Sequence, residues 1–167
     1  GSLTAGTHAM VARFSGFGSL QPSSSATLSY VVAKAPTTVA VSQSPATPTY
    51  GAAVTYTVVV RSSAGAPTGS VAVSDGTTGL GVCALGALDA TGATCSVTTS
   101  APLAAGLHQI GAAYGGASDY SIAAAAILPS TIGQASVALT VASSSLSSPY
   151  GRAVTFTVTA AGANGTV

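Results

Sequence analysis

Few side chains in this sequence could carry out chemistry: two cysteines, two histidines and three aspartates, with no glutamate, among 167 residues. Cys83 and Cys95 lie on adjacent expected strands, on either side of a turn near Ala90-Thr91-Gly92. This placement predicts a cross-strand disulfide that closes a hairpin and indicates an oxidising compartment outside the cytosol. Two buried free thiols are the alternative. A catalytic thiol is disfavoured because the pattern puts no histidine beside either cysteine.

The two histidines, His8 and His108, occupy equivalent positions in a repeated motif. A functional interpretation would make each a metal ligand or a general base. One histidine per repeat, with no cysteine, glutamate or second histidine beside it, cannot build a zinc site. The serines show no Gly-x-Ser-x-Gly motif or Ser/His/Asp set. We therefore expect no catalytic, metal-binding or cofactor-binding residues, and we interpret the histidines as structural residues at the start of a strand.

The sequence repeats itself at a spacing of 100 residues. Residues 50–58 (YGAAVTYTV) return as residues 150–158 (YGRAVTFTV), and residues 5–8 (AGTH) return as residues 105–108 (AGLH). A fixed period of this kind is typical of tandem domains. The chain holds one whole repeat and parts of others at its two ends, as expected of a window cut from a longer array. A neighbouring chain could also supply the missing strands by strand addition.

The phase of the repeat predicts three segments. Residues 1–34 would be the C-terminal strands of one repeat, residues 35–134 a complete repeat, and residues 135–167 the N-terminal strands of the next. The joints are expected at Lys34-Ala35 and Gln134-Ala135, where the last strand of one domain runs almost directly into the first strand of the next. Such short joints limit bending. A unit of about 100 residues can bury its own hydrophobic core.

The complete repeat has the pattern of an all-β domain. Apolar and polar residues alternate over Ala53–Val60, which is typical of a half-buried strand. Six further strands, separated by turns, are expected over residues 37–42, 69–74, 80–85, 94–99, 107–114 and 121–132. The alanines of residues 123–128 suit a helix, but the matching residues 23–32 suit a strand, and we expect a strand. About seven short strands per 100-residue repeat predict a two-sheet sandwich.

Charged side chains make up only 4% of the sequence, against roughly 25% in ordinary domains. Nucleic acids and anionic membranes require clustered lysine and arginine, so neither is an expected partner. The longest charge-free stretch, residues 120–151, contains two prolines and is a poor membrane helix. A nearly uncharged surface resists self-association poorly. This suits a packed fibre, in which the partners are neighbouring repeats and other copies of the chain.

Four segments of the complete repeat share their residue pattern with a known family: residues 50–58, 67–76 (PTGSVAVSDG), 80–81 (LG) and 103–114 (LAAGLHQIGAAY). The chain thereby resembles the bacterial immunoglobulin-like repeats of large surface proteins. The resemblance implies tandem immunoglobulin-like β-sandwiches, secreted or displayed on a cell, and it implies no chemistry. Related repeats often place an aspartate after the Tyr-x-Gly turn. Calcium needs several oxygen ligands, and Asp119 alone follows this turn, so calcium-stiffened joints are not expected.

The expected function is mechanical. The chain would be a non-enzymatic structural repeat of an extracellular fibre, filament or surface stalk, acting by tandem stacking and side-by-side packing. An alternative is an adhesin repeat or binding module that recognises an unknown glycan or protein of a host or another surface. A third possibility is an accessory domain of a secreted enzyme or a phage structural protein. Residues 164–166 (NGT) match an N-glycan acceptor, but a tight Asn-Gly turn is the preferred interpretation.

Overall fold

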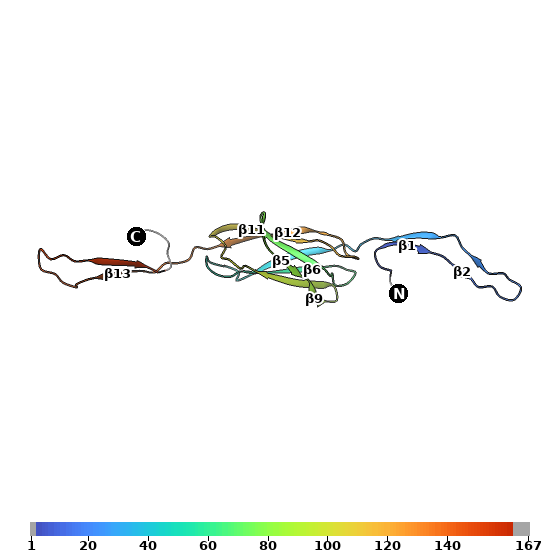
Figure 1. Ribbon diagram of the computed structural model, residues 1–167, viewed down its shortest axis with the longest axis horizontal. Coiled ribbons are helices and arrows are strands. Elements are labelled where there is room, and N and C mark those ends of the chain that lie inside the picture. Colours follow the sequence, from blue (N-terminus) through green and yellow to red (C-terminus); the bar gives the residue numbers. More distant parts are fainter. Residues whose placement is uncertain (1–2, 162–167) are drawn as a thin grey trace. The chain divides into compact units, whose positions relative to one another are not determined.

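The computed structural model describes residues 3–161, except for the side chains of Ala124 and Ala125, so the expected turn at residues 164–166 lies outside it. Strands make up all the regular structure in this range, which confirms the expected all-β fold. No helix long and apolar enough to span a membrane occurs in the described range. The chain divides into two compact units, with the boundary between Gly133 and Gln134 (Figure 1).

The first unit contains a sandwich of two four-stranded antiparallel sheets (Figure 1). One sheet has the order β5-β6-β10-β9, with bounds Thr38–Ser44, Thr55–Arg61, Gly92–Thr98 and Gly86–Asp89. The other has the order β12-β11-β7-β8, with bounds Ala123–Ile132, Gly106–Tyr114, Ser70–Asp75 and Thr78–Ala84. The sandwich thus has one strand more than the seven expected. The additional strand is β9, which pairs with β10 in a stretch that the sequence pattern left unassigned.

Strand β6 shows how the sequence pattern becomes a buried face. Tyr56, Val58 and Val60 are 0% exposed, whereas the residues between them are half-buried. The alternation follows from the two-residue period of a strand, in which successive side chains point to opposite faces. It confirms the half-buried strand expected over Ala53–Val60.

Strand β12 contains the alanine-rich residues whose intrinsic propensity suits a helix. Its pairing with β11, from Gly106↔Ile132 to Tyr114↔Ala123, holds these residues in a strand, as expected. Helix propensity is a weak preference that tertiary contacts override. Here the overriding contact is the edge of β11, whose backbone groups would otherwise lack partners.

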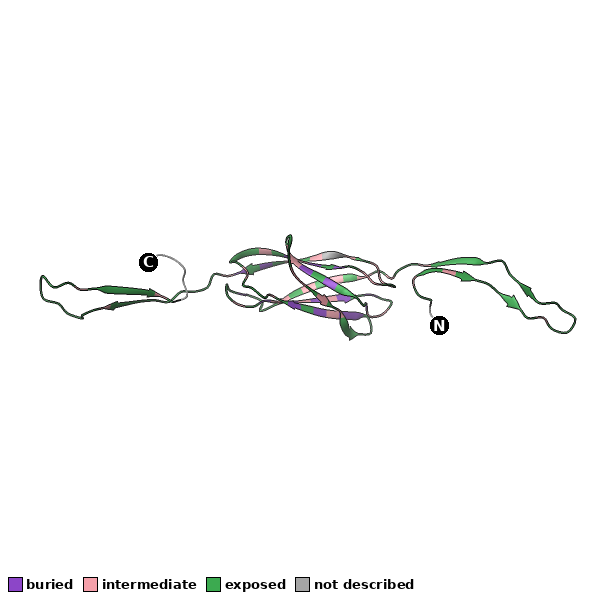
Figure 2. Cartoon of the chain, in the orientation of Figure 1, coloured by how far each residue is buried: buried purple, intermediate pink, exposed green. Residues whose placement is uncertain are grey.

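The core between the two sheets is built mainly of valines and two tyrosines, and Figure 2 shows that the buried residues are concentrated in the sandwich. The buried apolar residues are Val54, Tyr56, Val58, Val60, Val71, Val73, Ala93, Cys95, Val97, Ile110, Ala112, Tyr114 and Ile132. Both tyrosine hydroxyls have partners. Tyr114 donates to the carbonyl of Thr68 at 2.6 Å, and the Tyr56 hydroxyl lies 3.5 Å from that of Ser130. The core therefore leaves neither hydroxyl unsatisfied.

Each end of the chain forms antiparallel hairpins. At the N-terminal end, β1 (Gly6–Met10) pairs with β4 (Leu28–Val32), and β2 (Arg13–Phe14) pairs with β3 (Ser23–Ser24). In the second unit, β13 (Leu139–Ser143) pairs with β14 (Phe156–Ala160).

The β1–β4 and β13–β14 hairpins reproduce hairpins of the sandwich, shifted by 100 residues. The pair Gly6↔Val32 corresponds to Gly106↔Ile132 of β11 and β12, and the other β1–β4 pairs follow in the same register. The pair Ser143↔Phe156 corresponds in the same way to Gln43↔Tyr56 of β5 and β6. The repeat in the sequence is therefore also a repeat in strand pairing.

The end hairpins differ from their counterparts in burial. Met10 is 47% exposed where the equivalent Ile110 is 0% exposed, and Phe156 is 68% exposed where Tyr56 is 0% exposed. The difference arises because only the sandwich has a second sheet over these faces (Figure 2). Equivalent positions thus form a core in one copy of the repeat and a surface in the others.

Candidate functional site

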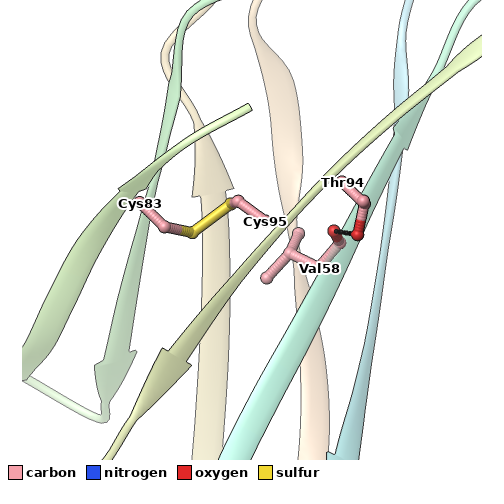
Figure 3. The surroundings of a disulfide bond; sticks show 4 residues. All are labelled: Val58, Cys83, Thr94 and Cys95. Atoms are coloured by element: carbon pink, nitrogen blue, oxygen red, sulfur yellow. Dashed lines mark hydrogen bonds between the residues drawn. A yellow bond between two sulfur atoms is a disulfide. The ribbon is translucent and has the colours of Figure 1, made fainter. Parts of the chain in front are cut away.

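A disulfide joins Cys83 to Cys95, 12 residues later, with a Cα–Cα distance of 5.7 Å. Both cysteines of the chain are in this bond, so neither is a free thiol available as a nucleophile or a metal ligand. Cys95 is 8% exposed and belongs to the core, and Cys83 packs against it. Figure 3 shows the two side chains meeting from different strands.

The disulfide does not close a hairpin, and this part of the prediction was wrong. Cys83 lies on β8 and Cys95 on β10, which belong to opposite sheets of the sandwich. The chain crosses between the sheets at Leu85, and the hairpin that turns at Ala90-Thr91 joins β9 to β10. The bond therefore links the two sheets across the core. The sequence interpretation missed this because it did not identify β9.

The polar neighbour of the disulfide lies on the opposite face of β10. Thr94 donates from its hydroxyl to the carbonyl of Val58 on β6 at 3.0 Å (Figure 3). Because successive residues of a strand point to opposite faces, Thr94 faces outward while Cys95 faces the other sheet. The surroundings of the sulfur atoms are accordingly apolar, as expected of a structural disulfide.

His108 forms an ion pair that the sequence interpretation missed. Its Nδ1 lies 2.6 Å from Asp75 Oδ2, and its Nε2 lies 2.9 Å from the carbonyl oxygen of Ala104. The two side chains are only 15% and 22% exposed. Both ring nitrogens face acceptors, so the doubly protonated imidazolium satisfies this site best. The Asp75 carboxylate first, and the Ala104 carbonyl second, raise the pKa of His108 above its ordinary value of 6.5.

The equivalent His8 keeps only half of this arrangement. Its Nε2 lies 2.8 Å from the carbonyl oxygen of Thr4, as His108 Nε2 does from Ala104. The histidine of each repeat thus contacts the carbonyl oxygen of the residue four positions earlier. In the complete copy, the Asp75 carboxylate of β7 is a second partner. Among residues 3–161, no three histidine, cysteine or acidic side chains gather as metal ligands would.

Asp89 anchors the turn between β9 and β10. Its carboxylate accepts the backbone N–H of Thr91 at 2.8 Å and pairs with Arg61 of β6, also at 2.8 Å. These two contacts, the backbone one first, lower the pKa of Asp89 to about 2. Both members of the ion pair are about half exposed, so it contributes little to stability.

The first expected joint, at Lys34 and Ala35, lies against the loop that follows β11. Lys34 Nζ donates to the carbonyl of Ala117 at 2.7 Å, and Ala35 exchanges backbone hydrogen bonds with Asp119 and Ser121. The Asp119 carboxylate also accepts the N–H of Ala5, just before β1, at 2.7 Å. Hydrogen bonds therefore connect the N-terminal hairpin segment to the sandwich at two places, just before β1 and just after β4.

The second expected joint lies at the boundary between the two compact units. Gln134 and Ala135 are exposed and lie between β12 and β13. Gly133, immediately before them, exchanges backbone hydrogen bonds with Pro48 and Tyr50. The last residue of the first unit is thus anchored to its own sandwich.

Comparison with protein families decides the identity of this fold. A sequence model of the bacterial Ig-like domain (group 3) family matches residues 41–140, more than half of the chain. The chain belongs to this family. Comparison with curated proteins and with solved structures finds no match. The match contains the disulfide and the His108–Asp75 pair, and it confirms the resemblance that the four sequence segments indicated.

Bacterial Ig-like domains are typically non-catalytic modules, commonly exposed at a surface. One hollow of the sandwich lies beside Arg61. It has a volume of about 400 Å³ and is lined by Pro36, Arg61 and five serine and threonine residues from positions 37–38, 62–63 and 91. Its single cation is already paired with Asp89. The hollow therefore brings together no set of groups that would activate a substrate.

Proposed function

We propose that this Ig-like chain is a structural segment of an extracellular fibre, filament or surface stalk built from tandem repeats. Its role is mechanical and non-enzymatic. The observation that carries the proposal is the recurrence of the same hairpins, in the same register, at a spacing of 100 residues. Repeated units of this kind extend along one direction, because each unit contacts mainly its neighbours.

The hydrogen bonds at the first joint support a load-bearing role. Two hydrogen bonds, described above, connect the preceding repeat to the complete one: Lys34 Nζ donates to the carbonyl of Ala117, and the N–H of Ala5 donates to the Asp119 carboxylate. A joint held only by a flexible linker would contain glycine and serine and make no such contacts. The joint thus favours an array whose repeats resist independent movement.

The disulfide and the low charge support an extracellular location. Structural disulfides persist in oxidising surroundings and are rare in the cytosol. A surface with few charges creates little long-range repulsion between neighbouring copies. Both features suit repeats that pack side by side outside the cell.

Immunogold electron microscopy of intact cells, with antibodies against the sandwich, tests this proposal. We expect labelled fibres or stalks whose density repeats once per Ig-like unit. Labelling that occurs only after the cells are lysed would contradict the extracellular role. A globular labelled particle with no repeating density would contradict the fibre.

The alternative role as an adhesin repeat is tested by glycan-array and cell-surface binding measurements on the same chain. Saturable binding that survives high salt would favour this alternative, because the surface offers few charges for non-specific attraction. We expect no such binding from the described residues, whose hollows are open and lack convergent charged groups.

A further inference from the structure

The sandwich has four edge strands, and three of them are protected from pairing with another chain. The outer strands β5 and β12 are joined to each other near both ends, through the bridges Ala35↔Tyr120 and Thr49↔Gly133. Strand β12 also contains Pro129, which cannot donate to a further strand. Strand β9 has only four residues and ends at Asp89, which pairs with Arg61. Short strands, prolines and charges are the usual protections of an edge.

The fourth edge, β8, lacks these three protections, although its pairing with β7 shifts register between Val73 and Ser74, so that only its C-terminal half, from Gly81, is regular. It spans seven residues, TGLGVCA, with no charged residue and no proline. The only charge on the β7–β8 hairpin is Asp75, which is held by His108. No strand among the described residues pairs with the outer side of β8.

The backbone groups that β8 presents outward follow from its register. Leu85 donates its N–H to the carbonyl of Gly69, so this pair faces β7. Residues that face the partner alternate along an antiparallel strand. Cys83 therefore also faces β7 with its backbone, whereas Val82 and Ala84 direct their N–H and C=O groups to the open edge. The side chain of Val82 is 71% exposed beside these groups.

The structure also holds this edge in place. The disulfide of Cys83 ties β8 to β10 across the core. A Cβ atom at Gly81 would lie 2.9 Å from Val97, so β8 lies directly against the opposite sheet at this point. An edge fixed in this way loses little conformational freedom when another strand pairs with it.

We propose that β8 is the lateral contact of this protein and pairs antiparallel with β8 of a second copy. A strand edge is self-complementary, because each residue offers one donor and one acceptor. A charged partner would find no counter-charge on β8, whereas a second copy brings only backbone groups and small uncharged side chains. The proposed contact rests on the proposed function. A single pair of β8 edges binds weakly, and tandem repeats increase the overall affinity because the first contact raises the effective concentration of the next.

Amide hydrogen exchange of the oxidised chain, measured from dilute to concentrated solution, tests this contact. We expect the Val82 and Ala84 amides to become protected as the concentration rises, because no strand of their own chain covers them. The Val82→Pro variant removes one outward donor without removing a hydrogen bond to β7, and we expect the Ala84 amide of this variant to lose its protection. Leu107→Lys on β11, which is 65% exposed on an interior strand, is the matched control and should keep it.

Exchange at Val82 and Ala84 that does not change with concentration would overturn the proposal. Protection confined to the end hairpins would overturn it as well, and would indicate strand addition at the partial repeats instead. Formation of the disulfide and an unchanged unfolding midpoint show that the Val82→Pro variant has folded. If fibres are seen at the cell surface but the β8 amides are not protected, only the β8 contact is rejected. The proposed function is then unaffected.

Discussion

At the scale of the residue, the pair formed by His108 and Asp75 has the clearest consequence. The carboxylate and the Ala104 carbonyl raise the pKa of His108 above 6.5 in the folded chain. A group with a raised folded-state pKa stabilises the fold fully below its unfolded value and loses this contribution as pH rises through the folded value. The Ig-like sandwich is therefore expected to become less stable as pH rises from about 6.5.

The His108→Gln variant tests this pH dependence. We expect the wild-type free energy of unfolding, measured by urea denaturation between pH 5.5 and 9, to fall above pH 6.5. The variant should be less stable at low pH and show a flatter profile. Asp89 does not interfere, because its lowered pKa of about 2 lies far below this range.

His8→Gln is the matched control for this measurement. His8 has the same carbonyl contact four residues earlier, and no carboxylate among the described residues bonds to its ring. We expect the pH profile of the sandwich to be unchanged in this variant. A profile that flattens equally in both variants would show that the Asp75 contact is not the cause.

At the scale of the element, equivalent positions of the repeat differ in what covers them. Ile110 on β11 is fully buried, whereas Met10 on β1 is 47% exposed. Ile110→Ala leaves a cavity and should destabilise the sandwich by about 2–5 kcal/mol. Met10→Ala should change the stability of the sandwich by less than about 0.5 kcal/mol. Denaturant unfolding of both variants, monitored by tyrosine fluorescence, measures the difference.

An equal loss in the two variants would contradict this assignment of the core. It would mean that the N-terminal hairpin unfolds together with the sandwich and carries a buried face of its own. Exposed positions on the same strands, such as Leu107, provide the baseline for substitutions that remove little buried surface.

Much of the fold could be predicted from local patterns. Alternation over β6 identified its buried face, and the repeat at 100 residues predicted strands at both ends of the chain. Strand β9 could not be predicted in this way, because Gly86–Asp89 is short, exposed at every position and shows no alternation. Its omission led to the wrong placement of the Cys83–Cys95 bond, since a crossing between sheets leaves no periodic signal.

The candidate site was predicted only in part, for a related reason. Sequence spacing indicated that the two cysteines would bond, but the pairing of His108 with Asp75 joins residues on β11 and β7 that are far apart in the chain. Register between strands places these side chains together, and register depends on the whole sheet.

The disulfide links the two sheets, so its loss should affect the whole sandwich. The Cys83→Ala/Cys95→Ala double variant removes a cross-link over 12 residues and should lower stability by about 2–3 kcal/mol. For a domain of this size the melting temperature should fall by roughly 10–20 °C. Calorimetry of the wild type and the variant measures this shift.

A reducing agent provides the control for the disulfide variant. It should lower the melting temperature of the wild type by a similar amount and leave the double variant unchanged. If the double variant melts at the wild-type temperature, the cross-link does not stabilise the folded sandwich. A reducing agent that also lowers the melting temperature of the variant would point to an effect unrelated to the bond.

At the scale of the whole molecule, the joint between repeats decides whether an array can carry load. The Asp119 carboxylate accepts the Ala5 N–H at 2.7 Å, and its backbone carbonyl accepts the N–H of Ala35. A single residue of the sandwich thus binds Ala5, just before β1 of the preceding repeat, and Ala35, the first residue of its own repeat. Side-chain substitution removes only the first contact, because the second belongs to the backbone.

The Asp119→Ala variant should therefore loosen the joint without unfolding the sandwich. A hydrogen bond to a charged group contributes about 1.5 kcal/mol or more, so exchange of the Ala5 amide should accelerate by roughly tenfold or more. Asp119→Asn retains an oxygen acceptor and should give an intermediate rate. Asp89→Ala, which removes a carboxylate elsewhere in the same sandwich, should leave the Ala5 amide unchanged. An Ala5 amide that exchanges at the wild-type rate in Asp119→Ala would mean that the Asp119 carboxylate does not couple consecutive repeats, and the joint would then depend on its other contacts, such as that of Lys34 with Ala117.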